Sequence, residues 1–286
     1  MTLPTDFADL GGKVVVVTGG SGVLGSEMCR ALSAAGARVA VLGRDPVKVE
    51  ALATELRARH AHGEAIGITC SVVDRNSLES AAERIKSVLG PCDILVNAAG
   101  GNHPKAATSA ETFDPEGATE PGKTYFFDLD LDGVKSVVDL NLIGTLLPTQ
   151  VFAAQMPGRA GCSVLNISSM SGFKPLTKVV AYSAAKAAVT NFTQWLAVHF
   201  ASAGIRANAI APGFFLTEQN RSLMLQADGS LTARAAKVIA HTPMGRFGEP
   251  AELLGTLLWL CDARLSGFVT GAVIPVDGGF SAFSGV

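Results

Sequence analysis

The chain lacks a marked excess of either charge. It carries 23 Lys and Arg residues against 25 Asp and Glu residues, for a formal net charge of −2 over 286 residues. No stretch stands out as basic, whereas nucleic-acid-binding domains gather Lys and Arg on one face. This balance argues against a nucleic acid partner.

Long apolar runs are also missing. No run reaches the roughly 18 residues that a membrane span requires. The first twelve residues, MTLPTDFADLGG, are polar and acidic, whereas a secretory signal begins with a basic region followed by an apolar one. We therefore expect a cytoplasmic protein with no membrane partner.

Cysteine and histidine are few and scattered. None of the five cysteines forms a CxxC pair, which is typical of buried thiols in a reducing compartment. The five histidines show no HxxxH spacing, so we predict no metal site. Asp128, Asp130 and Asp132 match half of a calcium loop, but that stretch runs directly into a predicted helix.

Apolar strand-like runs alternate with helical patterns along the chain. The runs lie at 14–18, 38–42, 65–69, 93–97, 163–167, 206–210 and 272–276. The helical patterns lie near 22–35, 46–60, 76–89, 134–155, 178–203 and 250–261. This alternation predicts parallel strand pairing and a layered α/β fold.

Glycines follow the first predicted strand. Residues 14–17 are all valine, as expected for a strand that is buried on both faces. Four glycines stand between this strand and the next helix: Gly19, Gly20, Gly22 and Gly25. Glycines in this position let backbone N–H groups approach a pyrophosphate at the start of a helix. The pattern predicts a dinucleotide site.

Three side chains indicate proton-transfer chemistry. Tyr182 and Lys186 are four residues apart, so they share one face of a helix, and Ser169 precedes the tyrosine by thirteen residues. A phenol of pKa about 10 is a weak acid or base at neutral pH, and a nearby ammonium lowers that pKa. We expect Tyr182 to act as a general acid or base.

Six motifs in order resemble the short-chain dehydrogenase/reductase family, and a DGG follows at 277–279. They are TGGSGVLG (18–25), NAAG (97–100), NLIG (141–144), NISS (166–169), YSAAK (182–186) and APG (211–213). The resemblance covers nearly the whole chain. It implies a single domain over 1–286 with a Rossmann-type, doubly wound parallel sheet of about seven strands and helices on both faces. It also implies an NAD(P)-dependent oxidoreductase that assembles as a homotetramer or homodimer.

The resemblance implies a catalytic set of four residues. Tyr182 would exchange a proton with the substrate oxygen, and Ser169 would hydrogen-bond that oxygen. Lys186 would lower the phenol pKa and hold the nicotinamide ribose. Asn141 would support a water that relays protons.

The resemblance also implies cofactor contacts near the ends of the strands. They are Gly19, Ser21, Gly22, Val23, Leu24, Arg44, Ser71, Val72, Asn97, Ala98, Ala99, Gly100, Tyr182, Lys186, Pro212, Gly213, Phe215 and Thr217. Two of these depart from the family pattern, because Val23 replaces a glycine and Ser71 replaces an aspartate. Both departures indicate a branch with its own cofactor geometry.

The end of the second predicted strand bears on the choice of dinucleotide. NAD-preferring sites usually carry an acidic residue there, whereas this chain has Gly43 followed by Arg44. An arginine can pair with a 2′-phosphate, so we predict NADP, with NAD as the alternative. Asp45 would repel a phosphate, but Pro46 after it indicates that Asp45 caps the next helix.

Two segments interrupt the alternation. Segment 101–133 far exceeds the usual connection of about 2–6 residues, and we predict an insertion that covers the substrate side of the crevice or an adjacent subunit. Segment 212–249 corresponds to the substrate flap of the family.

Further details resemble the D-mannonate oxidoreductase (fructuronate reductase) branch. They are GSGVLG (20–25), GGNHP (100–104), FFLTEQNR (214–221) and GGFSAFSGV (278–286). This resemblance implies carbohydrate metabolism, with hydride transfer between the nicotinamide cofactor and a sugar acid. Such a substrate needs hydroxyl partners and a cation for its carboxylate. We assign these roles to Asn102, His103, Gln219, Asn220 and Arg221, with Arg221 for the carboxylate.

Two alternatives stay open. Another short-chain reductase could act on 3-oxoacyl thioesters, polyols or steroid-like carbonyls, although the flap mixes apolar and polar residues. A dinucleotide-binding sensor without turnover is the other alternative. The intact catalytic set argues against the sensor.

Overall fold

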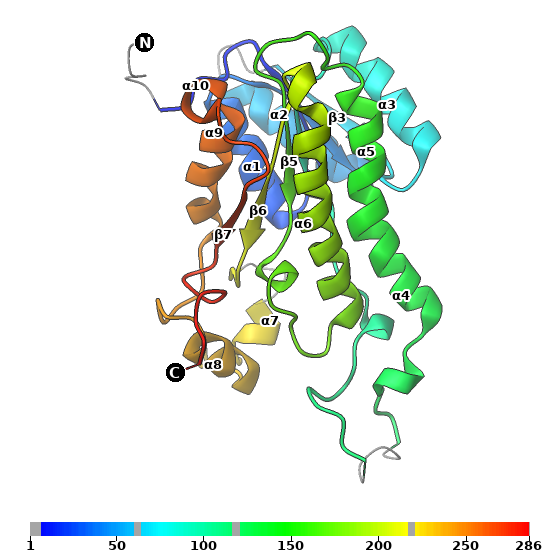
Figure 1. Ribbon diagram of the computed structural model, residues 1–286, viewed down its shortest axis with the longest axis vertical. Helices are drawn as coiled ribbons and strands as arrows, with labels where there is room; N and C mark the ends of the chain where they lie inside the picture. Colours follow the sequence, from blue (N-terminus) through cyan, green and yellow to red (C-terminus); the bar gives the residue numbers. More distant parts are fainter. Residues whose placement is uncertain (1–6, 60–63, 116–120, 217–220, 286) are drawn as a thin grey trace.

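The computed structural model describes residues 7–59, 64–115, 121–216 and 221–285. At its centre is a seven-stranded sheet of order β3-β2-β1-β4-β5-β6-β7, in which every pairing is parallel (Figure 1). The strands are β1 (Val14–Thr18), β2 (Arg38–Gly43), β3 (Ala65–Thr69), β4 (Ile94–Asn97), β5 (Ser163–Ile167), β6 (Arg206–Pro212) and β7 (Val273–Val276). The predicted doubly wound α/β fold is confirmed, and the strand order reverses between β1 and β4.

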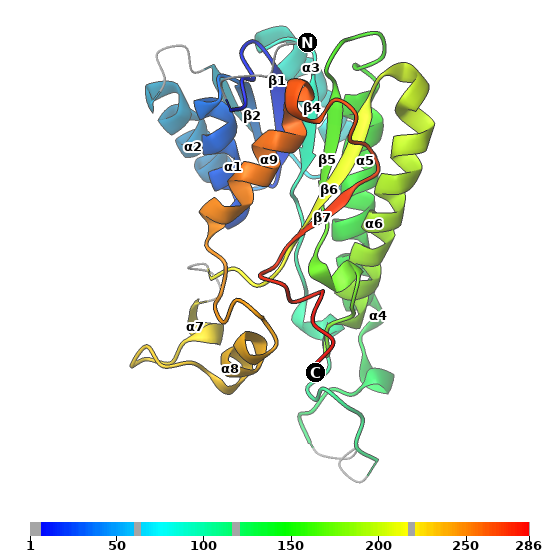
Figure 2. The same cartoon turned by 60° about the vertical axis from the view of Figure 1, so that its left-hand side comes forward.

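Helices cover both faces of the sheet (Figure 2). One face carries α1 (Val23–Ala34), α2 (Pro46–Arg59) and α9 (Leu254–Cys261). The other carries α3 (Arg75–Val88), α5 (Gly144–Ala153) and α6 (Val180–Phe200). Alternate residues of β1 serve the two cores, because Val15 and Val17 pack on the first set of helices while Val14 and Val16 pack on the second.

The helical stretch predicted at 134–155 is interrupted. It comprises α4 (Leu131–Val138), a π-helical turn (Asp139–Ile143) and α5. A single π turn widens a helix locally and is frequent at functional sites. Residues Leu131–Ala153 are long and apolar enough to cross a membrane by length and composition, but α5 packs against β4 and α3 and places Phe152 in the core.

The insertion, the flap and the C-terminus gather beyond the carboxyl ends of the strands (Figures 1 and 2). The insertion begins with a 3-10 turn at Pro104–Ala106, and the flap contains α7 (Arg221–Met224) and α8 (Ala233–Ala240). These flap helices were not predicted. A short helix, α10 (Ala263–Ser266), follows α9.

The aspartates of the calcium-like stretch bond to nearby backbone. The side chain of Asp130 caps α4 by accepting a hydrogen bond from Gly133 N at 2.6 Å, and that of Asp128 accepts one from Tyr125 N at 3.1 Å. Within the described residues there is no group of three or more His, Cys, Asp or Glu that could hold a metal ion.

All five cysteines are buried free thiols, as predicted. Burial raises the pKa of each of them: Cys29, Cys70, Cys92, Cys162 and Cys261. None of these thiols is therefore a ready thiolate nucleophile at neutral pH.

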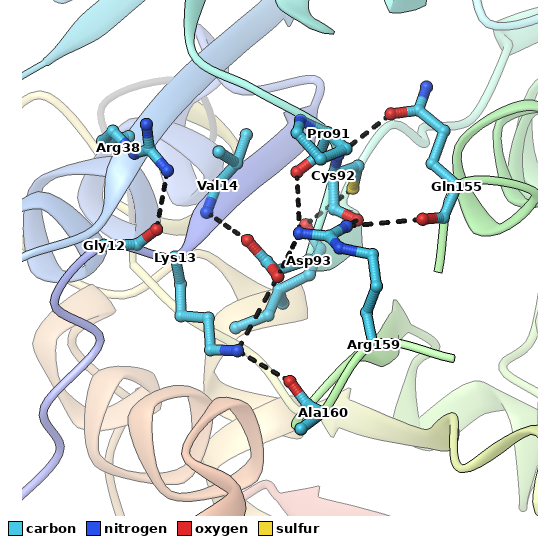
Figure 3. A network of polar contacts seen from close by, with 11 residues as sticks. Gly12, Lys13, Val14, Arg38, Pro91, Cys92, Asp93, Gln155, Arg159 and Ala160 are labelled. Carbon is cyan, nitrogen blue, oxygen red and sulfur yellow. Dashed lines mark hydrogen bonds and ion pairs between the residues drawn. The ribbon is translucent and has the colours of Figure 1, made fainter. Parts of the chain in front are cut away.

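A buried carboxylate fastens the opposite end of the sheet (Figure 3). Asp93, just before β4, accepts hydrogen bonds from Val14 N at 2.9 Å and from the Arg159 guanidinium at 2.6 Å. Lys13 lies 3.7 Å from the same carboxylate and donates to the Ala160 carbonyl at 2.8 Å. The network joins β1, β4 and the loop before β5, far from the carboxyl ends of the strands.

We predict that Asp93→Ala lowers the free energy of unfolding by about 2–4 kcal/mol, because it leaves a buried N–H and an arginine without their acceptor. Urea unfolding measures this change. Glu79→Gln is the matched control, since Glu79 pairs with Arg75 on the exposed surface at 3.3 Å and should lose at most about 0.5 kcal/mol. Equal losses in the two variants would contradict a special role for Asp93.

Candidate active site

The start of α1 fits a dinucleotide pyrophosphate. Gly19 has φ of 64° and turns the chain out of β1. Gly22 precedes α1 with φ of −76° and gives the helix no side-chain cap. The first N–H groups of α1 thus lack a side-chain acceptor, which is the arrangement that binds phosphate at helix starts. Val23 is the first residue of the helix, so the turn itself needs no glycine at 23.

Two neighbouring side chains crowd position 43 at the end of β2. A Cβ on Gly43 would lie 2.5 Å from Ser21 Oγ and 2.9 Å from a Val49 methyl carbon. The Asp45 carboxylate accepts hydrogen bonds from the backbone N–H groups of Val47, at 3.0 Å, and Lys48, at 3.2 Å. The prediction that Asp45 caps the next helix is therefore confirmed. Arg44 is exposed and makes no hydrogen bond or ion pair with any described residue.

The other predicted cofactor residues follow strand ends along the same edge of the sheet. Ser71 and Val72 follow β3, residues 98–100 follow β4, and Gly213 and Phe215 follow β6. The side chain of Asn97 is turned into the core, where it donates to Thr149 Oγ1 and Asn166 Oδ1, both at 2.9 Å. Only its main chain remains for a cofactor contact. Thr217 lies outside the described residues.

The four predicted catalytic residues converge from three elements. Ser169 follows β5, and its hydroxyl lies near enough to the Tyr182 phenol on α6 to lower the phenol pKa. Lys186 Nζ lies 5.7 Å from the centroid of the Tyr182 ring and donates to the Ile167 carbonyl at 2.8 Å. A Cβ on Gly100 would lie 2.8 Å from Asn141 Oδ1 and 3.1 Å from Lys186 Nζ. The amide and the ammonium therefore flank the same glycine.

Asn141 lies in the π-helical turn and is fully buried. Its Nδ2 donates to the carbonyls of Gly101, at 2.7 Å, and Val137, at 2.8 Å, while its Oδ1 accepts from Gly101 N at 3.2 Å. Its carbonyl accepts from the Thr145 hydroxyl at 2.8 Å. The Asn141 side chain thus holds the loop after β4 in place. The proton-relay water predicted for Asn141 would need the second lone pair of the main-chain carbonyl.

A buried polar chain extends from Asn141 beneath the sheet. The Thr149 hydroxyl donates to the Thr145 carbonyl at 2.7 Å and accepts from Asn97. Asn166 receives a hydrogen bond from Asn97 and donates to Thr193 Oγ1 at 2.9 Å. This series of buried polar side chains was not predicted from the sequence. The signal for it was an asparagine within each of two largely apolar strands, Asn97 and Asn166.

Burial shifts the two titrating catalytic groups in opposite directions. It lowers the pKa of Lys186 from its ordinary 10.5 to about 8. It raises the pKa of the Tyr182 phenol above its ordinary 10.0, against the opposing effect of the Ser169 hydrogen bond. The net shift of the phenol pKa is therefore upward in the cofactor-free protein, and Lys186 is not among its causes. The ammonium loses its own proton first and cannot stabilise the phenolate at higher pH.

Two pockets lie beside this edge and share Phe214. One of about 350 Å³ contains Arg246 and Glu252, and one of about 380 Å³ contains Arg234 and Lys237. These residues form no motif in the sequence, because they are brought together only by the fold of the flap and the tail.

The predicted substrate residues that the structure describes, Asn102, His103 and Arg221, do not line either of these pockets. Asn102 and His103 are exposed, and His103 Nδ1 accepts a hydrogen bond from Lys105 N at 3.2 Å. Arg221 begins α7 and is exposed. Gln219 and Asn220 lie outside the described residues.

Comparisons with known proteins give consistent results. A family model described as short chain dehydrogenase matches residues 13–228. The uncharacterized oxidoreductase UxuB of Bacillus subtilis (strain 168) is 51% identical over 97% of this chain and 98% of its own length. A galactitol 2-dehydrogenase (L-tagatose-forming) of Cereibacter sphaeroides is 32% identical over 96% of this chain and 97% of its own.

Among solved structures, a provisionally assigned D-mannonate oxidoreductase from Haemophilus influenza with bound NAD superposes with a TM-score of 0.93. It is 46% identical, and the match covers 98% of each chain.

We predict that Lys186→Met stabilises the cofactor-free protein at pH 7 by up to about 3 kcal/mol, because a pKa depressed by burial makes the charged lysine unfavourable in the fold. Between pH 8 and 10.5 the unfolded parent binds more protons than the folded parent, so the parent gains stability with rising pH. The advantage of the variant should therefore shrink across that window.

Urea unfolding at pH 7 and pH 10 measures the effect. Lys48→Met is the control, because the Lys48 side chain is 70% exposed and this variant keeps the buried Lys186. A variant that is less stable than the parent at pH 7 would contradict the account.

Proposed function

Because the chain belongs to the short-chain dehydrogenase/reductase family, we propose that it transfers a hydride between a nicotinamide dinucleotide and a sugar acid of the D-mannonate/D-fructuronate type. The observation that carries the proposal is the convergence of Ser169, Tyr182 and Lys186 at a sheet edge that also holds a pocket lined by basic side chains. The similarity to the provisionally assigned D-mannonate oxidoreductase supports the choice of substrate.

The side chains of this chain would handle the proton. At neutral pH both Tyr182 and Lys186 are protonated, since the pKa of the phenol is raised and that of the ammonium is about 8. Tyr182 would donate its proton to the carbonyl oxygen that Ser169 also hydrogen-bonds. The dinucleotide, when bound, supplies the hydride. This protonation state favours reduction near neutral pH, while oxidation requires a deprotonated phenol and should gain with rising pH.

Arg44 supports NADP as the preferred dinucleotide. The cap made by Asp45 holds its carboxylate at α2, and the Ser21 hydroxyl and a Val49 methyl group crowd the place that an acidic side chain would take at the end of β2. An exposed arginine at this position can pair with a 2′-phosphate. NAD is the alternative, supported by the NAD-bound relative.

The assembly would be a cytoplasmic homotetramer or homodimer in which α6 contributes a contact face. Trp195 and Val198 on this helix are 55% and 81% exposed, and large exposed apolar side chains on one helix are typical of a covered surface. The insertion at 101–133 would cover the substrate side of the crevice or the neighbouring subunit.

A second candidate substrate is a 3-oxoacyl thioester or another apolar ketone. Phe214, Phe280 and Phe283 line the pocket of about 380 Å³, and a 3-oxoacyl-[acyl-carrier-protein] reductase of Aquifex aeolicus is 31% identical over 94% of this chain. The basic residues of the same pocket favour the sugar acid.

The proposal predicts turnover of an open-chain sugar acid in a cofactor absorbance assay that covers hexuronates, aldonates, neutral polyols and acyl thioesters, each with NAD(H) and NADP(H). Tyr182→Phe should reduce turnover of the accepted substrate by about 10²–10⁴-fold, because only the exchangeable proton is lost. Its affinity for the dinucleotide should remain. Turnover of acyl thioesters alone would overturn the choice of substrate.

We predict that Arg44→Gln raises the KM for NADP by about tenfold, the equivalent of one charge-assisted contact of about 1.4 kcal/mol, and leaves that for NAD nearly unchanged. Initial rates with each dinucleotide at a saturating substrate measure this difference. Arg59→Gln on the far end of α2 is the control. A parent enzyme that uses NAD far better than NADP, with Arg44→Gln behaving like the parent, would refute the preference.

A further inference from the structure

The pocket of about 380 Å³ is strongly basic. We call it the basic pocket and define it by Lys174, Arg234, Lys237 and His241. Four separate parts of the chain form it: the insertion, segment 174–177, the flap with Phe214 and α8, and the tail at 280–285. All four parts lie beyond the carboxyl ends of the strands (Figures 1 and 2).

Among the described residues that line the basic pocket, cationic side chains outnumber acidic ones. Glu111 is the acidic residue of this described lining and pairs with Lys237. The pKa of Glu111 is lowered first by that hydrogen bond and also by the charges of Lys178 and Arg234. Lys174 adds a further charge. Arg234 makes no hydrogen bond or ion pair with any described residue, so its guanidinium is available to an anion.

Aromatic side chains and the tail form the rest of the wall. Lys174 Nζ donates to the Phe283 carbonyl at 2.8 Å, and the His241 ring meets the Phe283 ring edge-on at 6.3 Å. Phe214 and Phe280 meet edge-on at 5.4 Å between their centroids. A pocket with apolar walls and a few charged groups is typical of small organic anions.

The chain that joins two catalytic residues also lines the basic pocket. Residues 174–177 lie between Ser169 and Tyr182, and Leu176 N donates to the hydroxyl of Ser183, next to Tyr182, at 3.2 Å. Lys178 has φ of 70°, a strained backbone for a residue with a side chain, and its carbonyl accepts from Thr108 N of the insertion at 2.9 Å. The insertion is thus fastened to the segment that leads into Tyr182.

We propose that the basic pocket binds the carboxylate of the substrate, with Arg234 and Lys237 as its main partners. This inference rests on the proposed function, which places the substrate carbonyl at Ser169 and Tyr182. A carboxylate needs a cationic partner when it leaves water, and an arginine fork binds it in a bidentate manner. The substrate carboxylate would share Lys237 with Glu111. We assign the carboxylate to this pocket and no longer to Arg221, which is not part of the pocket lining.

The test compares charge-removing variants that keep side-chain length. Arg234→Gln/Lys237→Gln should raise the KM for the accepted sugar acid by about tenfold or more, with kcat and the KM for a neutral polyol little changed. Glu111→Gln breaks the same ion pair but keeps both cations, so it should not raise the KM for the acid. Arg246→Gln removes an arginine of the neighbouring pocket, which pairs with Glu252 at 2.7 Å, and should behave like the parent.

Several results would overturn the inference. They are an unchanged KM in the double variant, an equal increase in Glu111→Gln or Arg246→Gln, or an increase that Arg221→Gln alone reproduces. All five substituted side chains, Glu111, Arg221, Arg234, Lys237 and Arg246, are exposed. The variants should therefore fold, and far-ultraviolet circular dichroism checks this. The single variant Arg234→Gln repeats the test with the ion pair intact.

Calorimetry separates this inference from the proposed function. If the parent turns over no sugar acid, the proposed function fails, and binding of D-gluconate to the intact protein then decides the inference. D-gluconate binding in the parent that is lost in the double variant, with no binding of mannitol, would support an anion pocket. No D-gluconate binding in the parent, or equal binding in the double variant, would overturn it.

Discussion

The buried ammonium of Lys186 is the constraint on which the site depends. Its side chain enters the interior of the protein, where it donates to the Ile167 carbonyl at 2.8 Å and has no carboxylate partner among the described residues. A buried cation without a counter-ion is unfavourable for folding. The surrounding structure makes room for it, because Gly100 lacks a side chain at the ammonium and Asn141 fastens the adjacent loop from a π-helical turn. The fold thus accepts a loss of stability at the place where chemistry occurs.

The same burial sets the order in which the two groups lose their protons. The Lys186 ammonium loses its proton with a pKa of about 8. The Tyr182 phenol loses its proton at higher pH, because its pKa is raised above the ordinary value. In the cofactor-free protein the phenol is therefore a proton donor across the neutral range, which suits reduction of a carbonyl. The basic pocket would supply the complementary element, a fixed positive end that orients an anionic substrate. Residues 174–177, which lie between Ser169 and Tyr182, then join the proton donor to the wall of that pocket.

Much of the fold and the position of the catalytic set could be predicted from the sequence. Runs such as residues 14–17 identify buried strands, and the motif order predicts which residues share the sheet edge. The direction in which the pKa of the Tyr182 phenol shifts could not be predicted, since it depends on how deeply the phenol itself is buried. The basic pocket was missed because its four parts are distant in sequence and meet only through the tail and α8. Arg221 could be chosen as the carboxylate partner from its own segment of sequence alone. Arg234 can take that role only because the fold brings the insertion, segment 174–177 and the tail beside it.

The most direct test of this account is an absorbance titration at 295 nm of the cofactor-free Tyr125→Phe protein. The chain has two tyrosines, so this variant leaves Tyr182 as the single phenol, and near-ultraviolet circular dichroism confirms the fold at each pH. The account predicts ionisation above the ordinary tyrosine pKa of 10.0 and little change when Lys186→Met is added, because Lys186 is neutral by then. A midpoint near neutral pH that moves upward in the double variant would contradict it.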